Sequence, residues 1–219
     1  MNSKTPRRLV IGISGASGAI YGVRMLEMLK KTDIETHLVM SKSAEMTLVY
    51  ETNFKPKEVR AMASVNHPTA DIGASISSGS FPTMGMIIVP CSIRTMSEIA
   101  TGVTSSLVSR AADVVLKERR KLVLGVRESP LHEIHLENML KLARMGAVIL
   151  PLMPGFYNKP SSIDDLVNHV VMRMLDQFGF DSSAAPRWAG MSKPAGKTSS
   201  RRNRARPRSR ASTRPIISA

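Results

Sequence analysis

The stretch Leu-Val-Ile-Gly-Ile-Ser-Gly-Ala-Ser-Gly-Ala-Ile-Tyr-Gly, residues 9–22, decides the fold class of this chain. A β-branched apolar run enters a loop of Gly and Ser, and apolar residues at helical spacing follow the loop. This order predicts a strand, a tight loop and a helix start, where free N–H groups favour an anion. We interpret the loop as a phosphate-binding loop with Ser14 and Ser17 as hydroxyl donors. It matches neither common Gly-rich nucleotide motif, so a turn that binds nothing is the alternative.

The composition of the 219 residues fits a single α/β domain in a reducing compartment. The one cysteine, Cys91, excludes an intrachain disulfide, and no apolar run reaches the ~18 residues of a membrane span. We therefore expect a cytoplasmic protein. The net charge is +14, but residues 191–219 hold nine Lys or Arg and no acid. We predict a domain over residues 1–190 and a basic, disordered tail over 191–219, which lacks the aromatic residues that would favour nucleic-acid binding.

Alternation of apolar runs with helical patterns predicts the architecture. The expected strands read as continuous apolar runs, which is typical of a parallel sheet covered on both faces; they span residues 9–13, 36–40, 86–90, 122–126 and 147–150. The expected helices span residues 19–30, 42–50, 94–118 with a break near Gly102, 132–145 and 162–178. This pattern predicts an α/β fold with a doubly wound parallel sheet, a flavodoxin-like or Rossmann-type three-layer sandwich.

Polar side chains follow each expected strand. The loops concerned are Ser14–Gly18, Ser41–Ser43, Pro90–Thr95, Arg127–Glu128 and Pro154–Tyr157. Any one of them could be ordinary turn chemistry. Ligands of doubly wound sheets bind beyond the carboxyl ends of the strands, so these loops should converge on one edge. Hydroxyl groups together with Arg at helix starts suit a phosphorylated cofactor.

Longer motifs make the chain resemble the UbiX flavin prenyltransferase family. The matching segments lie in family order over about residues 8–188, and the most specific are R-A-A-D-V-V-L-K-E-R-R (110–120) and P-G-F-Y (154–157). The resemblance implies FMN as the prenyl acceptor and dimethylallyl monophosphate as the donor, with transfer to N5 and C6 of reduced flavin and no metal. It implies a homo-oligomer, a dodecamer in most members. The product, prenylated FMN, would serve a UbiD-type decarboxylase in ubiquinone or aromatic acid metabolism.

The resemblance also implies roles for individual residues. The FMN contacts fall on Gly15, Ala16, Ser17, Ser41, Ser92, Ile93, Arg94, Thr95 and Arg127. The donor site falls on Arg110, Lys117, Arg127, Tyr157, Arg173 and Trp188, and the catalytic positions are Ser17, Glu51, Glu128 and Lys117. Glu128 would relay a proton to the departing phosphate. Ile72 stands where some members have an aromatic residue near the prenyl site, which puts an aromatic cage for the carbocation in doubt.

The residues alone leave other interpretations open. Lys117 at a helix end could be a solvated terminus, and Arg110 could simply pair with a carboxylate. His132 and His135 fit a helix surface better than a metal site, and Cys91 fits a buried apolar position better than a nucleophile.

Two competing functions follow from the sequence. The first is an FMN-dependent decarboxylase of peptidyl-cysteine or phosphopantothenoylcysteine. Such an enzyme needs a histidine base in an N-H-I-x-L-type segment, but Pro68 and Thr69 follow His67 here. The second is a nucleic-acid binder that uses the basic tail.

Overall fold

The computed structural model describes residues 7–180. The chain divides into two units, Met1–Trp188 and Ala189–Ala219, and all described residues belong to the first. Trp188 and the basic tail 191–219 lie outside the described residues, so the expectations that concern them stay predictions. No helix within residues 7–180 combines the length and the apolarity needed to cross a bilayer.

A parallel sheet of six strands forms the centre of the described unit, in the order β3-β2-β1-β4-β5-β6. The strands are β1 (Arg8–Ile13), β2 (Glu35–Met40), β3 (Val65–His67), β4 (Gly85–Cys91), β5 (Lys121–Val126) and β6 (Val148–Ile149). The chain runs outward from β1 to β3 and then crosses back to β4. The strand order therefore reverses between β1 and β4, the place where doubly wound sheets bind ligands. The predicted fold class is confirmed.

Seven α-helices connect or follow these strands. They are α1 (Ala19–Leu29), α2 (Lys42–Glu51), α3 (Pro56–Arg60), α4 (Ile93–Thr101), α5 (Leu107–Lys117), α6 (Glu133–Arg144) and α7 (Ile163–Asp176), with a short 3₁₀ turn at Ser75–Ser77. The predicted break near Gly102 is confirmed, because Gly102 ends α4 with a φ of 74° and Ser106 caps α5. The short elements β3 and α3 were not predicted, since their few residues carry no measurable periodicity.

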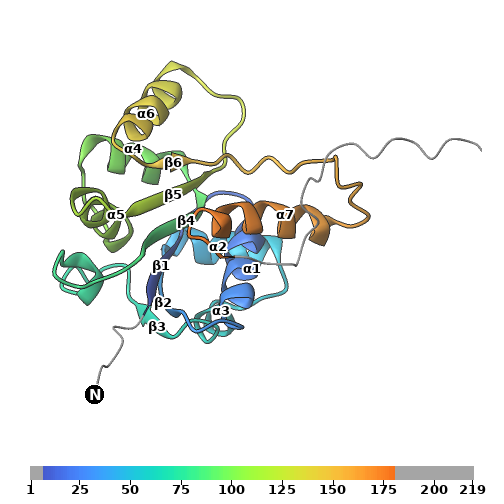
Figure 1. Cartoon of the computed structure of the whole chain (residues 1–219), viewed down its shortest axis with the longest axis horizontal. Helices are drawn as coiled ribbons and strands as arrows, with labels where there is room; N and C mark the ends of the chain where they lie inside the picture. Colours follow the sequence, from blue (N-terminus) through green and yellow to red (C-terminus); the bar gives the residue numbers. More distant parts are fainter. Residues whose placement is uncertain (1–6, 181–219) are drawn as a thin grey trace, which may run out of the picture. The chain divides into compact units, whose positions relative to one another are not determined.

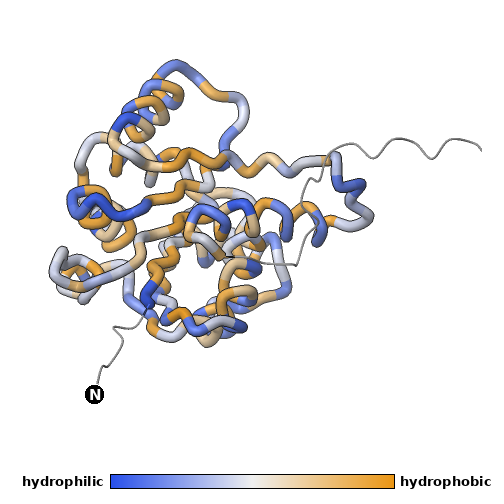
Figure 2. The backbone as a smooth tube through the Cα atoms, viewed as in Figure 1, coloured by the Kyte–Doolittle hydropathy of each residue, from blue (hydrophilic) through white to orange (hydrophobic). Residues whose placement is uncertain are grey.

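The helices cover both faces of the sheet (Figure 1). Ile11 of β1 packs in the cluster that includes α1, α2 and α7, whereas its neighbour Val10 packs in the cluster that includes α4, α5 and α6. Successive side chains of a strand point to opposite faces, so a strand buried on both sides must be apolar throughout. Figure 2 shows the central strands as hydrophobic stretches inside helices of mixed character.

Helix α7 is fixed by its first turn and by α1. Ser162 Oγ accepts a hydrogen bond from the Asp165 N–H at 3.1 Å, and the Asp165 carboxylate accepts one from the Ser162 N–H at 3.0 Å. Arg24 of α1 bonds to Asp164 at 2.9 Å and also to Asn168. The helix start that the sequence predicted from Ser162 and Asp165 is confirmed, and the polar contacts with Arg24 set the position of α7 beside α1.

Candidate functional site

A cleft of about 730 Å³ lies at the carboxyl edge of the sheet, next to the ends of β1, β2 and β4. This volume is within the roughly 300–1,000 Å³ of small-molecule sites. Predicted cofactor or catalytic residues that line it are Gly15, Ser41, Ser92, Ile93, Arg94, Thr95 and Glu128. The sequence predicted that five loops meet at this edge. Four of them line the cleft: the loops after β1, β2 and β4, which carry predicted cofactor residues, and the loop after β5, which carries Glu128.

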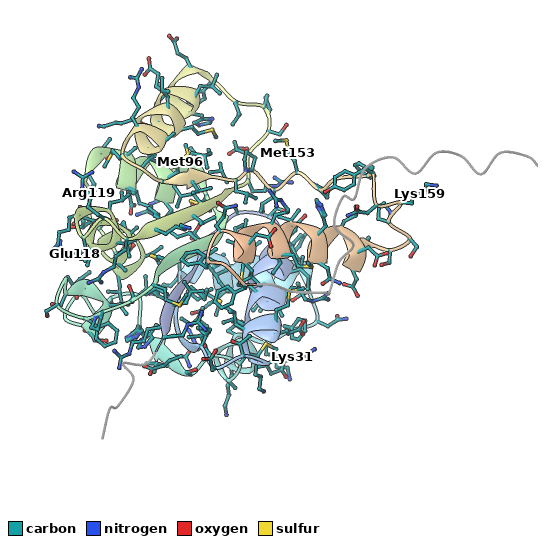
Figure 3. The ribbon with its side chains drawn as sticks, in the orientation of Figure 1. Lys31, Met96, Glu118, Arg119, Met153 and Lys159 are labelled. Carbon is teal, nitrogen blue, oxygen red and sulfur yellow. The ribbon has the colours of Figure 1, made fainter. Side chains whose placement is uncertain are left out.

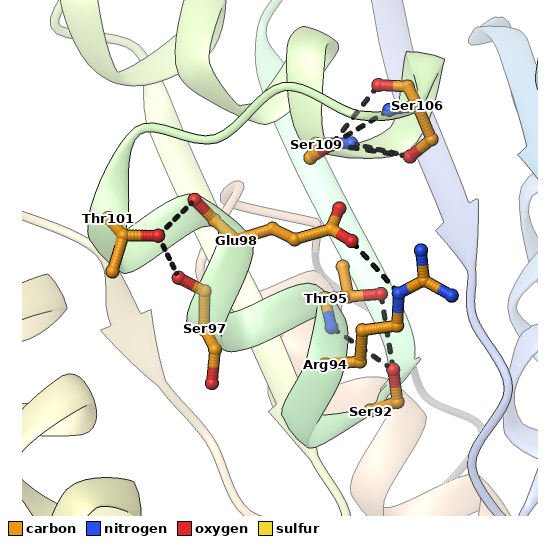
Figure 4. Close-up of polar contacts among 8 residues, drawn as sticks. All are labelled: Ser92, Arg94, Thr95, Ser97, Glu98, Thr101, Ser106 and Ser109. Carbon is orange, nitrogen blue, oxygen red and sulfur yellow. Dashed lines mark hydrogen bonds and ion pairs between the residues drawn. The ribbon is translucent and has the colours of Figure 1, made fainter.

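Three helices begin at this cleft. Ser41 Oγ accepts a hydrogen bond from the Ala44 N–H at 3.1 Å and so caps α2, and Ser92 Oγ accepts one from the Thr95 N–H at 3.3 Å and caps α4. Ser106 caps α5 in the same way (Figure 4). The unpaired N–H groups and the dipole of each helix start favour a negative charge. The cleft is therefore suited to a phosphorylated ligand.

Arg94 is one of three cationic residues that line the cleft, together with Lys42 and Arg60. Its Nε–H donates to the Glu98 carboxylate at 3.0 Å, and its side chain is 81% exposed. Figure 4 shows the two terminal nitrogens of Arg94 directed away from Glu98. Because a guanidinium binds phosphate oxygens in a two-pronged fashion, this orientation allows Arg94 to contact an anion without losing its carboxylate partner.

The loop after β1 differs from the sequence-based interpretation in two ways. The carboxylate of Glu51 accepts hydrogen bonds from the Gly18 N–H at 2.8 Å and the Ala19 N–H at 3.1 Å, so a side chain of this protein occupies the start of α1. Ser14 is buried, and its hydroxyl donates to the Pro90 carbonyl at 3.0 Å while it accepts from the Ser92 N–H at 2.8 Å. The interpretation of Ser14 as a ligand donor is therefore wrong, because that hydroxyl joins the loops after β1 and β4.

Ser17, Glu51 and Arg127 form a small charged cluster beside the cleft. Burial acts to raise the pKa of Glu51, but hydrogen bonds from the Ser17 side chain and from two backbone N–H groups, together with the charge of Arg127, lower it overall. Burial raises the pKa of the neighbouring Tyr21, and Arg127 opposes that shift. The structure thus brings together three predicted site residues with Tyr21, which the sequence did not single out.

Three of the cations predicted for the donor phosphate pair with carboxylates that are close to them in the sequence. Arg110 pairs with Asp113 at 2.9 Å, Arg173 pairs with Asp176 at 2.8 Å, and Lys117 pairs with its neighbour Glu118. Lys117 ends α5 at the amino edge of the sheet, roughly 16 Å along the helix from Ser106 at the cleft. Figure 3 shows Glu118 and Arg119, the residues that follow Lys117, on the opposite side of the unit from Met153 and Lys159.

Tyr157 lies in the segment that leaves β6. Its hydroxyl is 2.8 Å from His169 Nε2 of α7, and Arg173 lies one turn further along the same helix. The Leu152 N–H donates to the Val126 carbonyl at 3.1 Å, which places the start of this segment beside the end of β5. Sequence reasoning missed His169, because nothing in the local pattern links it to a tyrosine twelve residues away.

Cys91, His132 and His135 were the other candidates that the sequence offered. Cys91 is fully buried, and burial raises the pKa of its thiol to about 12, so the prediction of a buried apolar role is confirmed. His132 and His135 stack with ring centroids 3.4 Å apart. Within the described part of the chain, no group of three or more metal-binding side chains occurs.

The chain is similar to proteins of known family over most of its length. Residues 1–175 match the Flavoprotein family model. The chain is 58% identical over 187 residues to Flavin prenyltransferase UbiX of Escherichia coli K12, which covers 84% of this chain and 99% of the relative. It is also 58% identical over 185 residues to a probable UbiX-like flavin prenyltransferase of Streptomyces sp. strain D7, covering 84% and 92% respectively.

Solved structures give the same assignment. A crystal structure of AnUbiX in complex with FMN and dimethylallyl pyrophosphate has a TM-score of 0.85 and 51% identity, and the match covers 86% of this chain and all of that one. A dodecameric FMN-dependent UbiX-like decarboxylase from Escherichia coli O157:H7 has a TM-score of 0.82 and 54% identity, with 84% and 100% covered. The FMN-dependent cysteine decarboxylase TvaF, with a TM-score of 0.57 and 14% identity, shares the fold alone. This chain belongs to the UbiX flavin prenyltransferase family.

Proposed function

We propose that this protein transfers a dimethylallyl group from a dimethylallyl phosphate to N5 and C6 of reduced FMN. The observation that carries the proposal is the cleft at which α2, α4 and α5 begin, with Arg94 and Glu128 in its wall. Its relative AnUbiX was crystallised with FMN and dimethylallyl pyrophosphate. The Asn66-His67-Pro68-Thr69 sequence lacks the pattern expected for a cysteine decarboxylase.

The residues of the cleft fit FMN. A flavin mononucleotide needs a phosphate site and donors for its polar ring edge, and the helix starts and hydroxyl groups of the cleft supply both. We assign FMN binding to Gly15, Ala16, Ser17, Ser41, Ser92, Ile93, Arg94, Thr95 and Arg127. A side chain at position 15 would place its Cβ 2.3 Å from the Cβ of Ser43, so only glycine allows these loops to approach so closely. When bound, reduced FMN supplies the two nucleophilic ring atoms.

The remaining site residues stabilise the negative charge that develops on the phosphate leaving group. The C–O bond of the donor breaks with its electron pair on phosphate, so nearby cations and hydrogen-bond donors lower the barrier. We assign this role to Arg110, Lys117, Arg127, Tyr157 and Arg173, and we keep Trp188, which lies outside the described residues, as a substrate-binding residue implied by the family motifs. Ring closure releases a proton, and Glu128 in the cleft wall receives it and passes it to the phosphate. We assign the two remaining catalytic positions to the hydroxyl group of Ser17 and the carboxylate of Glu51.

The position of Lys117 supports a donor site that is built from more than one copy of the chain. Lys117 and Arg127 lie at opposite edges of the sheet, so they share a donor site only if two subunits meet there. Large apolar side chains are exposed on α2 and on the segment that carries Tyr157, among them Tyr50, Met153 and Phe156. A dodecameric relative is known. We propose a homododecamer in the cytoplasm, with delivery of prenylated FMN to a UbiD-type decarboxylase.

Mass spectrometry of the flavin tests the function. Purified protein is incubated without oxygen with reduced FMN and either dimethylallyl monophosphate or dimethylallyl pyrophosphate, and protein-free mixtures serve as controls. We expect the flavin to gain one C5 unit with the monophosphate; product with the pyrophosphate alone would change the donor and not the reaction. FMN that is bound but unmodified with both donors would contradict the proposal and favour the FMN-dependent decarboxylase.

A further inference from the structure

We propose that His169 is a positioning residue that aligns the Tyr157 hydroxyl with the phosphate of the prenyl donor, a role that rests on the proposed function of Tyr157. Three contacts between the segment 155–157 and His169 support this role. His169 Nε2 lies 2.8 Å from Tyr157 Oη, the Gly155 N–H donates to His169 Nδ1 at 3.4 Å, and the two rings stand edge to face at 82°. No motif or spacing in the sequence predicted a role for His169.

The hydrogen-bond network assigns the tautomer of His169. A backbone N–H only donates, so Nδ1, which faces the Gly155 N–H, must be an acceptor. A neutral imidazole with an unprotonated Nδ1 carries its hydrogen on Nε2. Nε2 therefore donates to Tyr157 Oη, so this bond uses the imidazole hydrogen and not the phenol hydrogen, and the phenol is the group that donates toward a phosphate oxygen when the prenyl donor binds.

This direction of the hydrogen bonds strengthens the phenol as a donor. In a chain that runs from the Gly155 N–H through the imidazole to the Tyr157 hydroxyl, each bond polarises the next. The phosphate gains negative charge as the C–O bond breaks. A polarised hydrogen-bond donor that is already in position stabilises this charge and lowers the barrier. His169 does this as a neutral group, without adding a second cation beside Arg173.

Close packing makes the arrangement specific. Tyr157 is 49% exposed on an irregular segment, and its contacts with His169 restrict the rotamers of its ring. A Cβ at Gly155 would lie 2.6 Å from Tyr157 Cε1 and 3.2 Å from His169 Cε1, so only glycine leaves room for both rings. His169 follows Asn168, which is bound to Arg24 of α1, and this places the imidazole on a fixed helix.

Four variants test the role of His169. They are His169→Phe, which keeps a ring but removes both hydrogen bonds; His169→Gln, which restores an acceptor and a donor; Tyr157→Phe; and the double variant Tyr157→Phe with His169→Phe. The readouts are kcat/KM for dimethylallyl monophosphate with reduced FMN, and the Kd of that donor by calorimetry on protein with oxidised FMN. Thermal melting and the Kd of FMN serve as controls for folding and for the cleft.

We expect His169→Phe to lower kcat/KM about tenfold, as for the loss of one oriented hydrogen bond. His169→Gln should stay within about threefold of the wild type, and His169→Phe should add no further loss in the Tyr157→Phe background. Equal losses in both backgrounds, no rescue by Gln, or an unaffected His169→Phe would each overturn the inference. If His169→Phe fails to fold, kcat/KM of His169→Gln is compared with kcat/KM of Tyr157→Phe. A loss in His169→Gln as large as the loss in Tyr157→Phe would overturn the inference. Wild-type protein that binds the donor but forms no adduct would contradict the proposed function, while the donor Kd values still test His169.

Discussion

The cleft differs from the three cations proposed for the donor site, Arg110, Lys117 and Arg173, in how its residues are brought together. The cleft is formed by loops that leave neighbouring parallel strands, so the strand order alone brings its residues together. The donor-site cations lie on α5 and α7, and each is paired with a carboxylate at most three residues away. The residues of the cleft therefore come together within one chain. The three cations lie on helix surfaces, so in our proposal they form a phosphate site only when another subunit packs against those helices.

The carboxylate pairs of these cations do not prevent a role in phosphate binding. The side chains of Arg110, Lys117 and Arg173 are between 34% and 55% exposed. Exposed ion pairs contribute only about 0–1 kcal/mol, so exchange of a local carboxylate for a phosphate with two charges costs little. The comparison suggests that a monomer is prepared to bind FMN, and that an assembled site is needed to bind the prenyl phosphate.

Glu128→Gln should give the largest effect, because it removes a proton relay from the complete part of the site. We expect kcat to fall about 100-fold or more, in the range measured for general acid–base residues, with little change in the Kd of FMN. Rapid-quench mass spectrometry of the adduct measures the rate, and Glu137→Gln, on the exposed face of α6, is the control. Unchanged turnover would remove Glu128 from the mechanism.

Lys117→Met should lower kcat/KM for the donor roughly 10- to 100-fold while FMN still binds, because only the donor phosphate loses a cation. Lys31→Met, an exposed lysine after α1, is the matched control.

Co-expression of Lys117→Met with Glu128→Gln tells whether one site uses two chains. If Lys117 reaches the site from another subunit, mixed oligomers contain some sites with both native residues, and activity returns to about a quarter of the wild-type value under random assembly. If both residues come from the same chain, every site keeps one defect and the mixture stays as weakly active as the single variants. The second result would contradict the intersubunit donor site.

Ser92→Ala should destabilise the fold and the cleft together. The loss of the α4 cap costs about 1 kcal/mol of the free energy of unfolding, and FMN should bind more weakly. Ser162→Ala removes the cap of α7 and should cost a similar amount without changing the Kd of FMN. Urea denaturation at a fixed protein concentration and flavin fluorescence measure the two effects. Equal FMN affinity in both variants would show that Ser92 acts only as a cap.

Glu51→Gln should give the smallest of these effects on the free energy of unfolding. The folded state lowers the pKa of Glu51, so its carboxylate stabilises the fold above its unfolded pKa near 4.5, and this contribution is lost as the pH falls through the lower, folded value. After a discount for the exposure of this side chain, we expect a loss of about 0.5–1 kcal/mol at pH 7. The difference from the wild type in urea denaturation should shrink below pH 4.5. A difference that is constant with pH would show that the charge of Glu51 is not involved; Glu137→Gln is again the control.

Much of the fold was determined by the sequence itself. The four longest strands, the place of the short strand β6, the break at Gly102 and the capped start of α7 follow from local patterns, because burial on both faces and helix capping depend on neighbouring residues. The position of the cleft follows as well, since a doubly wound parallel sheet brings the ends of its strands to one edge. The family motifs predicted roles for individual site residues, which hydrophobic periodicity cannot predict.

Only the tertiary structure decided which side chains pair. It placed Glu51 on the start of α1 and directed the Ser14 hydroxyl to Pro90, contacts that span 33 and 76 residues of sequence. It paired Tyr157 with His169 and left Lys117 at the far edge of the sheet. Such contacts depend on the distance between elements after packing and on the partner that satisfies each polar group. A linear pattern encodes which residues are buried or helical, but it does not encode which polar atoms lie within 3 Å of one another once the chain has folded.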